Sequence, residues 1–133
     1  MACAIGRAVG NWLHNAFAIA SDAMGKREFN RVRRIALALP GVQERTSHGA
    51  PCFFIRNKRP LCYYHDNHRG DGRISLWFAA TPDLQDAMLR IDPKRFFRPA
   101  TSSAGAFDNW LAVFLDVGDP PNWTEIAALL ERA

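Results

Sequence analysis

The stretch LALPGVQERTSHGAPCFFIRNKRPL, from Leu37 to Leu61, decides the fold that we expect for this chain. Its first residues complete a helix that we expect to end at Leu39. Pro40 cannot continue a helix and Gly41 tolerates a positive φ, so the two together stop it. A polar turn is expected next, and it holds four candidate contact residues, Arg45, Ser47, His48 and Gly49.

The second half of the stretch predicts a β-hairpin with a basic tip. An apolar strand runs from Cys52 to Ile55, the chain turns over residues 56–59, and a second apolar segment returns from Leu61 to Tyr64. Pro60 has no N–H to donate, so we expect an edge or a bulge beside the turn. The stretch therefore delivers a helix, a turn and a hairpin in succession.

Further elements alternate along the rest of the chain. A helix with an apolar stripe begins at residue 26, and Thr81 followed by Pro82 is a typical helix start. Asn122 with Glu125 resembles a capping box ahead of a last helix. The other expected elements are strands over residues 73–78, 96–97 and 110–115. Because adjacent strands are joined by short connections, we predict an α+β fold, with an antiparallel β-sheet and helices packed on one face.

The length of 133 residues favours a single domain, and the first 25 residues stand apart from it. Ile5, Val9 and Trp12 recur at helical spacing, so residues 1–25 are expected to form an N-terminal extension with helical character, ahead of a domain over residues 26–133. No apolar run approaches the roughly 20 residues that cross a bilayer, and the three cysteines include no C-x-x-C pair. We therefore expect a cytoplasmic protein with no membrane partner.

Several motifs in order carry a family resemblance. They are Ala36-Leu37-Ala38-Leu39-Pro40-Gly41-Val42 with Ser47-His48-Gly49 and Pro51, then Asp92-Pro93 with Phe96-Phe97 and Pro99, then Trp110-Leu111 with Val113, Leu115 and Asp116 ahead of Trp123. On these motifs the chain resembles the MmcQ/YjbR-like family over residues 26–133. The resemblance implies a compact fold similar to frataxin-like (CyaY-like) domains, and it implies DNA binding, the property commonly attributed to the family. At residues 100–103 the sequence lacks the aromatic residue and the glycine that are typical of the family. This difference affects the loop expected there and leaves the expected fold unchanged.

Positive charge is concentrated in one half of the chain. Residues 26–73 carry 11 basic and 4 acidic side chains, a net charge of +7, whereas the whole chain has +4. Such a bias favours a polyanionic partner. We therefore expect nucleic acid, DNA in particular, to be bound by non-sequence-specific phosphate contacts through a basic hairpin. The residues expected to make these contacts are Arg56, Lys58, Arg59, Arg69 and Arg73.

The turn at Ser47, His48 and Gly49 supports an alternative. His48 can bind a phosphate or exchange a proton, or it can cap the turn through a backbone carbonyl, and both interpretations stay open. On the functional interpretation, Ser47 and His48 belong to a small-ligand or protein-interaction module. His65 and His68 are spaced like metal ligands but lack the further ligands that a metal site needs. We expect no metal, no cofactor and no catalytic set, which favours a binding protein over an enzyme, and the oligomeric state stays open.

Overall fold

The computed structural model describes residues 26–47, 49–100, 105–117 and 121–133. Within them, six strands form one antiparallel sheet in the order β1-β2-β3-β4-β6-β5. The strands are β1 (Val42–Ser47), β2 (Ala50–Ile55), β3 (Arg59–Asp66), β4 (Ile74–Ala79), β5 (Phe96–Phe97) and β6 (Trp110–Phe114). The helices are one over residues 26–37, the short 3-10 turn η1 (His68–Gly70), α2 (Pro82–Ile91) and α3 (Trp123–Arg132). Residues 1–25, for which the sequence predicts an extension, and His48 lie outside the described residues.

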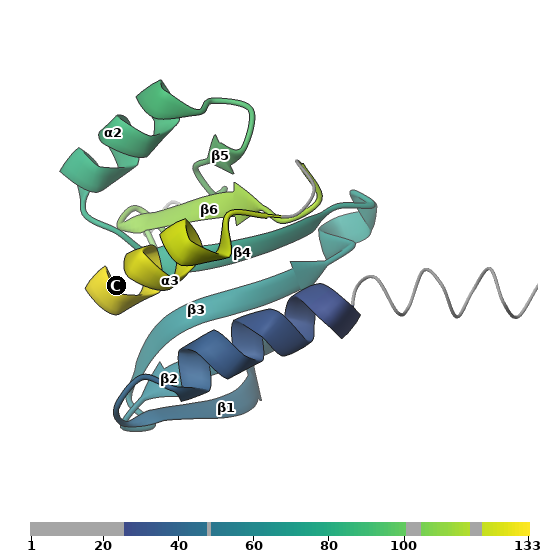
Figure 1. Ribbon diagram of the computed structural model, residues 1–133, viewed down its shortest axis with the longest axis vertical. Coiled ribbons are helices and arrows are strands. Elements are labelled where there is room, and N and C mark those ends of the chain that lie inside the picture. The colour runs from purple at the N-terminus through teal and green to yellow at the C-terminus, as the bar shows by residue number, and fades with distance from the viewer. Residues whose placement is uncertain (1–25, 48, 101–104, 118–120) are drawn as a thin grey trace, which may run out of the picture.

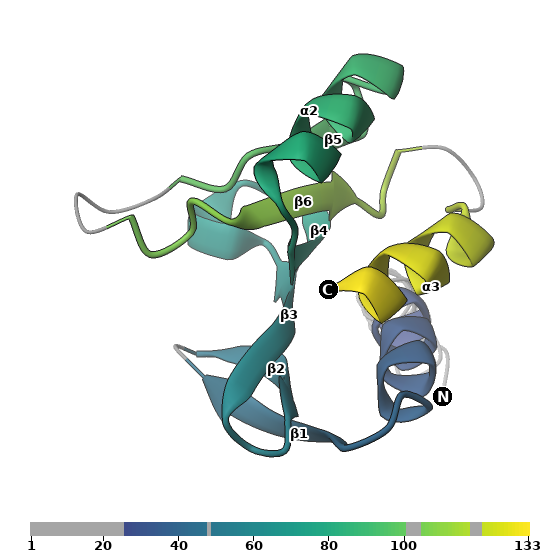
Figure 2. The ribbon, with the colours of Figure 1, turned by 90° about the vertical axis from the view of Figure 1, so that its left-hand side faces the viewer.

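The helices pack on one face of the sheet, which confirms the predicted α+β fold. Val32 of the helix over residues 26–37, Met88 of α2 and Ile126 of α3 share one buried cluster with side chains from the strands. The helix over residues 26–37 and α3 lie side by side (Figure 2), and α2 lies next to β5 (Figure 1). Each of the three α-helices buries one apolar stripe against the sheet, and this burial holds the two layers together.

The opposite face of the sheet carries a second apolar cluster, which no α-helix of the described residues covers. Its largest members, Tyr63, Trp77 and Trp110, are only 8, 7 and 9% exposed. Phe107, from the segment ahead of β6, packs edge-on against Trp77 with the ring centroids 5.3 Å apart. These aromatic rings bury one another, so they belong to the core and are not a free stacking surface.

Residues 42–47 form the edge strand β1, where the sequence predicts a polar turn. The strand pairs with β2 along its whole length. Its side chains are exposed or only half-buried, as expected at the edge of a sheet, where polar residues discourage pairing with another chain. The prediction of a turn was wrong because an edge strand with little buried surface lacks the apolar alternation by which strands are identified. Because β1 extends to Ser47 and β2 begins at Ala50, only residues 48 and 49 connect the two strands.

Both predicted helix starts are confirmed. At the start of α2 the Thr81 hydroxyl accepts a hydrogen bond from the Leu84 N–H at 3.3 Å. At the start of α3 the Asn122 side chain accepts one from the Glu125 N–H at 3.1 Å. These bonds satisfy amide groups that have no carbonyl partner within the first helical turn.

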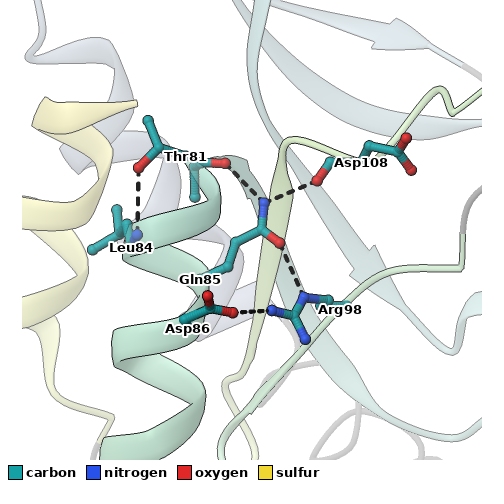
Figure 3. A network of polar contacts seen from close by, with 7 residues as sticks. Thr81, Leu84, Gln85, Asp86, Arg98 and Asp108 are labelled. Atoms are coloured by element: carbon teal, nitrogen blue, oxygen red, sulfur yellow. Dashed lines mark hydrogen bonds and ion pairs between the residues drawn. The ribbon is translucent and has the colours of Figure 1, made fainter.

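A buried amide, Gln85, ties α2 to the segment ahead of β6. Its Nε2 donates to the carbonyl oxygens of Ala80 and Asp108, both at 2.9 Å, and its Oε1 accepts from Arg98 Nε at 3.1 Å. Arg98 also forms an ion pair with Asp86, the residue that follows Gln85 in the helix. One network therefore joins α2 to the segment after β5 (Figure 3). Gln85 is only 2% exposed, although glutamine usually faces water.

Candidate nucleic-acid interface

The hairpin between β2 and β3 presents the predicted basic tip to solvent. Arg56 and Asn57 have φ angles of +51° and +56°, and the Lys58 N–H donates to the Ile55 carbonyl at 3.0 Å. Two successive positive φ values are characteristic of a type I′ turn, whose twist matches that of paired strands. The register of the two strands shifts beside Pro60, which confirms the expected irregularity. The tip therefore carries its exposed charges on a well-defined turn.

The tip lies where the helix over residues 26–37 and α3 both end. The Arg56 N–H donates to the carbonyl of Gly41, in the turn after the first of these helices, at 2.7 Å. Arg59 Nη2 donates to the carbonyl of Ala133, the residue that follows α3, at 3.5 Å. No carboxylate of the described residues forms an ion pair with Arg56, Lys58 or Arg59. Their charge is therefore available to an outside partner.

Arg69 belongs to η1, which follows β3, and Arg73 directly precedes β4, so both lie at the other end of β3 from this tip. The eight residues of β3 separate the two ends, about 23 Å at roughly 3.3 Å per residue. Arg69 is exposed within η1 and has a φ of +53°. The five residues predicted from the sequence therefore form two separate groups and not one site.

Arg73 is engaged within the protein. Its Nε and Nη2 donate to the two carboxylate oxygens of Asp116 at 2.9 and 2.8 Å, and its guanidinium lies 3.8 Å from the centroid of the Phe114 ring. The Ile74 N–H donates to the same carboxylate at 3.1 Å. The hydrogen bond from Arg73 holds the pKa of Asp116 below its ordinary value of 3.8. This bidentate pair joins β4 to the end of β6, so Arg73 is better suited to a structural role than to a phosphate contact.

A second group of arginines, which our sequence reasoning did not assign to the site, lies on the helix over residues 26–37. Arg27, Arg31 and Arg34 line a cavity of about 380 Å³ together with Pro121 and Trp123, at the start of α3. Their spacing of four and three residues puts them on one side of the helix. This spacing was the signal by which the sequence could have revealed the group, because all three are exposed and off the apolar stripe.

The arginines of this cavity, like those of the hairpin tip, have no carboxylate partner among the described residues. Within the described part of the chain, Arg27, Arg31 and Arg34 form no ion pair, although Arg31 lies 5.8 Å from the centroid of the Trp123 ring. Four arginines elsewhere are neutralised by neighbouring carboxylates, in the pairs Arg33–Glu44, Arg73–Asp116, Arg95–Asp92, Arg95–Glu125 and Arg98–Asp86. Glu28 also lines the cavity, but its Oε2 is buried and finds no partner among the described residues. The cavity thus has an excess of positive charge.

The start of α3 adds to the positive potential of this cavity. The first N–H groups of a helix and its macrodipole both favour an anion at the N-terminus. Asn122 caps one of these N–H groups, and its neighbours Pro121 and Trp123 face the three arginines across the cavity. The arrangement is suited to hold phosphate or another oxyanion.

Another cavity, of about 440 Å³, borders the turn that the sequence singled out. Gly49, with a φ of +76°, lies at its edge, and so do residues from the end of β3 and from η1. The Ser47 and Tyr63 hydroxyl groups are hydrogen-bonded to each other, so Ser47 already has a partner in the sheet. His48 lies outside the described residues, and its proposed role stays a prediction.

His65 lines the same cavity and is buried. Its ring is 8% exposed and lies with its centroid 4.4 Å from that of His68 and 4.2 Å from that of Trp77. Burial lowers the pKa of His65 to about 4, and the nearby His68 contributes to this shift, so the ring is neutral at pH 7. Its Nε2 has no hydrogen-bond partner in the described part of the chain.

The described residues were also compared with the requirements of a metal site and of a membrane-spanning helix. They contain no group of three or more His, Cys, Asp or Glu side chains arranged to hold a metal ion. None of the helices that the structure describes has the length and apolar character needed to cross a bilayer.

Comparisons with known proteins support the fold. A family model described as YjbR matches residues 37–133. Among solved structures, the crystal structure of Deinococcus radiodurans protein DR2400, described as a DUF419 domain, is similar with a TM-score of 0.56. The similarity covers 74% of this chain and 70% of that chain at 16% sequence identity, a level at which it shows the fold alone. No curated protein matches the sequence.

Proposed function

The chain belongs to the YjbR family, and we propose that it binds nucleic acid, DNA in particular, through phosphate contacts that do not depend on base sequence. The observation that carries the proposal is the row of Arg27, Arg31 and Arg34, which lines one cavity without a carboxylate partner among the described residues. Unpaired guanidinium groups in a row are suited to phosphates because each can donate two parallel hydrogen bonds.

The proposed surface consists of this helical row and the hairpin tip. The row spans about 10 Å, at roughly 1.5 Å per residue from Arg27 to Arg34. It runs towards the hairpin tip, whose Arg56 is hydrogen-bonded to the turn that follows the helix. Lys58 and Arg59 extend the charge beyond the end of the helix. In this proposal Arg73 has no direct contact, because Asp116 already occupies its guanidinium.

The charge pattern also accounts for the expected lack of sequence preference. Contacts to phosphates position a protein on a nucleic acid but do not distinguish one base from another. Three neutralised phosphates on duplex DNA correspond to a slope of about −2.7 for the logarithm of the binding constant against the logarithm of salt concentration. Contacts from the hairpin tip would make the slope steeper.

Fluorescence anisotropy with labelled duplex and single-stranded DNA over a salt series tests the proposal. Replacing Arg27 and Arg34 by Gln should reduce the magnitude of the salt slope by about 1.8, because two phosphate contacts are removed. A matched control replaces Arg90 and Lys94, two exposed cations at the end of α2 and the turn after it, by Gln. It removes the same charge and should leave the slope close to that of the wild type.

The hairpin tip is tested separately by replacing Arg56 and Lys58 with Ala. A weaker affinity for every sequence, with a smaller salt slope, is expected if the tip follows the phosphate backbone. No binding at low salt, or equal losses in the control and in both test variants, would refute the proposal. The cytoplasmic location stays a prediction alongside it.

A further inference from the structure

An aromatic ring borders the cavity of the arginine row. Trp123 is the first residue of α3, and it lines the cavity of about 380 Å³ together with Arg27, Arg31 and Arg34. Glu28 is the one carboxylate among the described residues of this lining, so three cations face one anion. The helix over residues 26–37 and α3 lie side by side, which brings the row and the ring together from distant parts of the sequence (Figure 2). Cations next to an aromatic ring are typical of surfaces that bind single-stranded nucleic acids.

The protein holds this ring in a defined position. Trp123 is half-buried, and it packs against the apolar cluster between the helices and the sheet. It follows the cap residue Asn122, whose side chain accepts a hydrogen bond from the Glu125 N–H at 3.1 Å. An aromatic side chain has only two rotatable bonds, so a ring anchored in this way binds a partner at a small cost in conformational entropy.

The neighbouring guanidinium of Arg31 does not close off the Trp123 ring. It lies 5.8 Å from the ring centroid, whereas the guanidinium of Arg73 lies 3.8 Å from the centroid of the Phe114 ring. Atoms in van der Waals contact are about 3.5 to 4.0 Å apart, so Arg31 is beyond contact with the ring. Its side chain is long and exposed, and it can therefore turn aside to admit a planar group.

The aromatic side chains at the centre of the sheet are not available in the same way. Tyr63, Tyr64 and Trp77 are buried within the two apolar clusters. Trp123, in contrast, combines partial exposure with three cations that have no carboxylate partner among the described residues. The page of contacts that a nucleic acid needs, a ring for a base and guanidinium groups for phosphates, is thus complete in one cavity.

We propose that this cavity binds single-stranded DNA, with one unpaired base stacked on the Trp123 ring and the adjacent phosphates held by Arg27, Arg31 and Arg34. The inference rests on the proposed nucleic-acid binding and names the form of DNA that the surface takes. In a duplex each base is paired and stacked on its neighbours, so it reaches a protein ring only after costly unstacking. A base in a single strand is free to stack, and every base offers a π-face, which keeps sequence preference weak.

Fluorescence anisotropy with three labelled probes separates base stacking from phosphate contacts on the full chain. The probes are a thymidine single strand of about 12 nucleotides, an abasic strand of equal length and charge, and a blunt-ended duplex. The wild type should bind the thymidine strand at least about fivefold more tightly than the abasic strand, because one base stacks on the ring. Both affinities should fall as salt rises, but their ratio should change little, because stacking releases no counterions.

Substitutions of Trp123 test the ring directly. Trp123→Leu keeps an apolar side chain against the cluster but removes the aromatic face, so the two strands should bind within about twofold of each other. Trp123→Phe keeps a smaller ring and should retain part of the preference. The matched control Phe97→Leu removes a half-buried ring from β5, at the far edge of the sheet, and should keep the full preference. A Trp123→Leu protein that is folded by circular dichroism and keeps the wild-type ratio would overturn the inference.

The indole N–H signals in ¹H–¹⁵N NMR spectra of the wild type give a second readout, which does not depend on the folding of a Trp123→Leu variant. The Trp123 signal should shift with the thymidine strand and much less with the abasic strand or the duplex. The signals of Trp77 and Trp110 serve as internal controls, because both side chains are buried on the opposite face of the sheet. An equal response of the Trp123 signal to the abasic strand or to the duplex would contradict the proposed stacking.

The failure of this inference is distinguishable from the failure of the proposed function. If the thymidine and abasic strands bind the wild type equally, and replacing Arg27 and Arg34 by Gln weakens both, the phosphate contacts stand and the stacked base is refuted. If none of the three probes binds at low salt, the proposed nucleic-acid binding is refuted, and this inference with it. A preference for the thymidine strand that is lost in Trp123→Leu supports both.

Discussion

Replacing Gln85 should reveal how strongly a single buried amide holds α2 to the sheet. Gln85→Met keeps the length and most of the volume of the side chain but removes its hydrogen-bonding groups. The carbonyl of Ala80 then loses a donor in a buried position, and the carbonyl of Asp108 loses one in a partly buried position. Arg98 loses an acceptor, but it keeps Asp86 and has access to water (Figure 3).

The expected loss of stability follows from these three contacts. A buried carbonyl left without a donor costs about 2 kcal/mol, a partly buried one about 1 kcal/mol, and the contact with Arg98, whose guanidinium keeps access to water, about 0.5 kcal/mol or less. The free energy of unfolding should therefore fall by about 3 kcal/mol, which lowers the midpoint of thermal unfolding by about 10 °C for a domain of this size. A fall of this size in the free energy of unfolding would show that a single polar side chain outside the apolar core contributes strongly to stability.

Urea unfolding at pH 7 followed by circular dichroism measures the effect, and two further variants isolate its cause. Gln85→Glu keeps the shape and the contact with Arg98 but removes both donors, so it should also be destabilised. Asp86→Asn removes only an exposed ion pair and should cost less than about 0.5 kcal/mol. The reasoning is refuted if Gln85→Glu is as stable as the wild type, or if Gln85→Met costs no more than Asp86→Asn.

Three other variants give distinct outcomes. Asp116→Asn should lower the free energy of unfolding at pH 7 by about 1 kcal/mol. Because pairing with Arg73 depresses the pKa of Asp116 in the folded state, that stability is present above the ordinary value of 3.8 and lost as pH falls below it, and urea titrations should show this acid loss only in the wild type. His65 has a folded pKa of about 4 against 6.5 when unfolded, so protonation favours the unfolded state and stability should fall between pH 6.5 and 4. His65→Phe should remove about 2 kcal/mol of this fall in the free energy of unfolding, as measured by urea unfolding across the same pH range. An unchanged pH dependence in the variant would show that the fall does not come from His65. Arg56→Asn combined with Asn57→Gly supplies the residues that a type I′ turn prefers and should raise stability by about 1 kcal/mol in a thermal scan, whereas a lower midpoint would argue against that turn.

Much of the fold could be predicted from the sequence because its signals are local. Thr81 with Pro82, and Asn122 with Glu125, fill the hydrogen-bonding needs of a helix start within a few residues of chain. The basic turn at Arg56 and its neighbours is likewise set by residues adjacent in sequence. β1 was missed because an edge strand is defined by its partner strand and not by its own apolar pattern.

The candidate site was predicted less well, because charge along a chain does not show where charges meet. Arg56 and Arg69 are 13 positions apart and seemed to belong to one basic region, but β3 carries them to opposite ends of the sheet. Arg73 seemed equally available until the fold brought Asp116, 43 positions away, against its guanidinium. The arginines of the helix over residues 26–37 gained their significance only when α3 was placed beside them.

By itself, the sequence determined the α+β class, the helix starts, the hairpin with its basic tip and the family, because each of these depends on residues close together in the chain or on motifs in order. Only the tertiary structure decided which cations stay unpaired and which residues enclose a cavity. Both depend on contacts between distant segments: Asp116 neutralises Arg73, whereas no described carboxylate neutralises Arg27 or Arg34. Coulomb interactions act through space, so the fold, and not the order of residues, determines what the stretch from Leu37 to Leu61 and the helix ahead of it present to a partner.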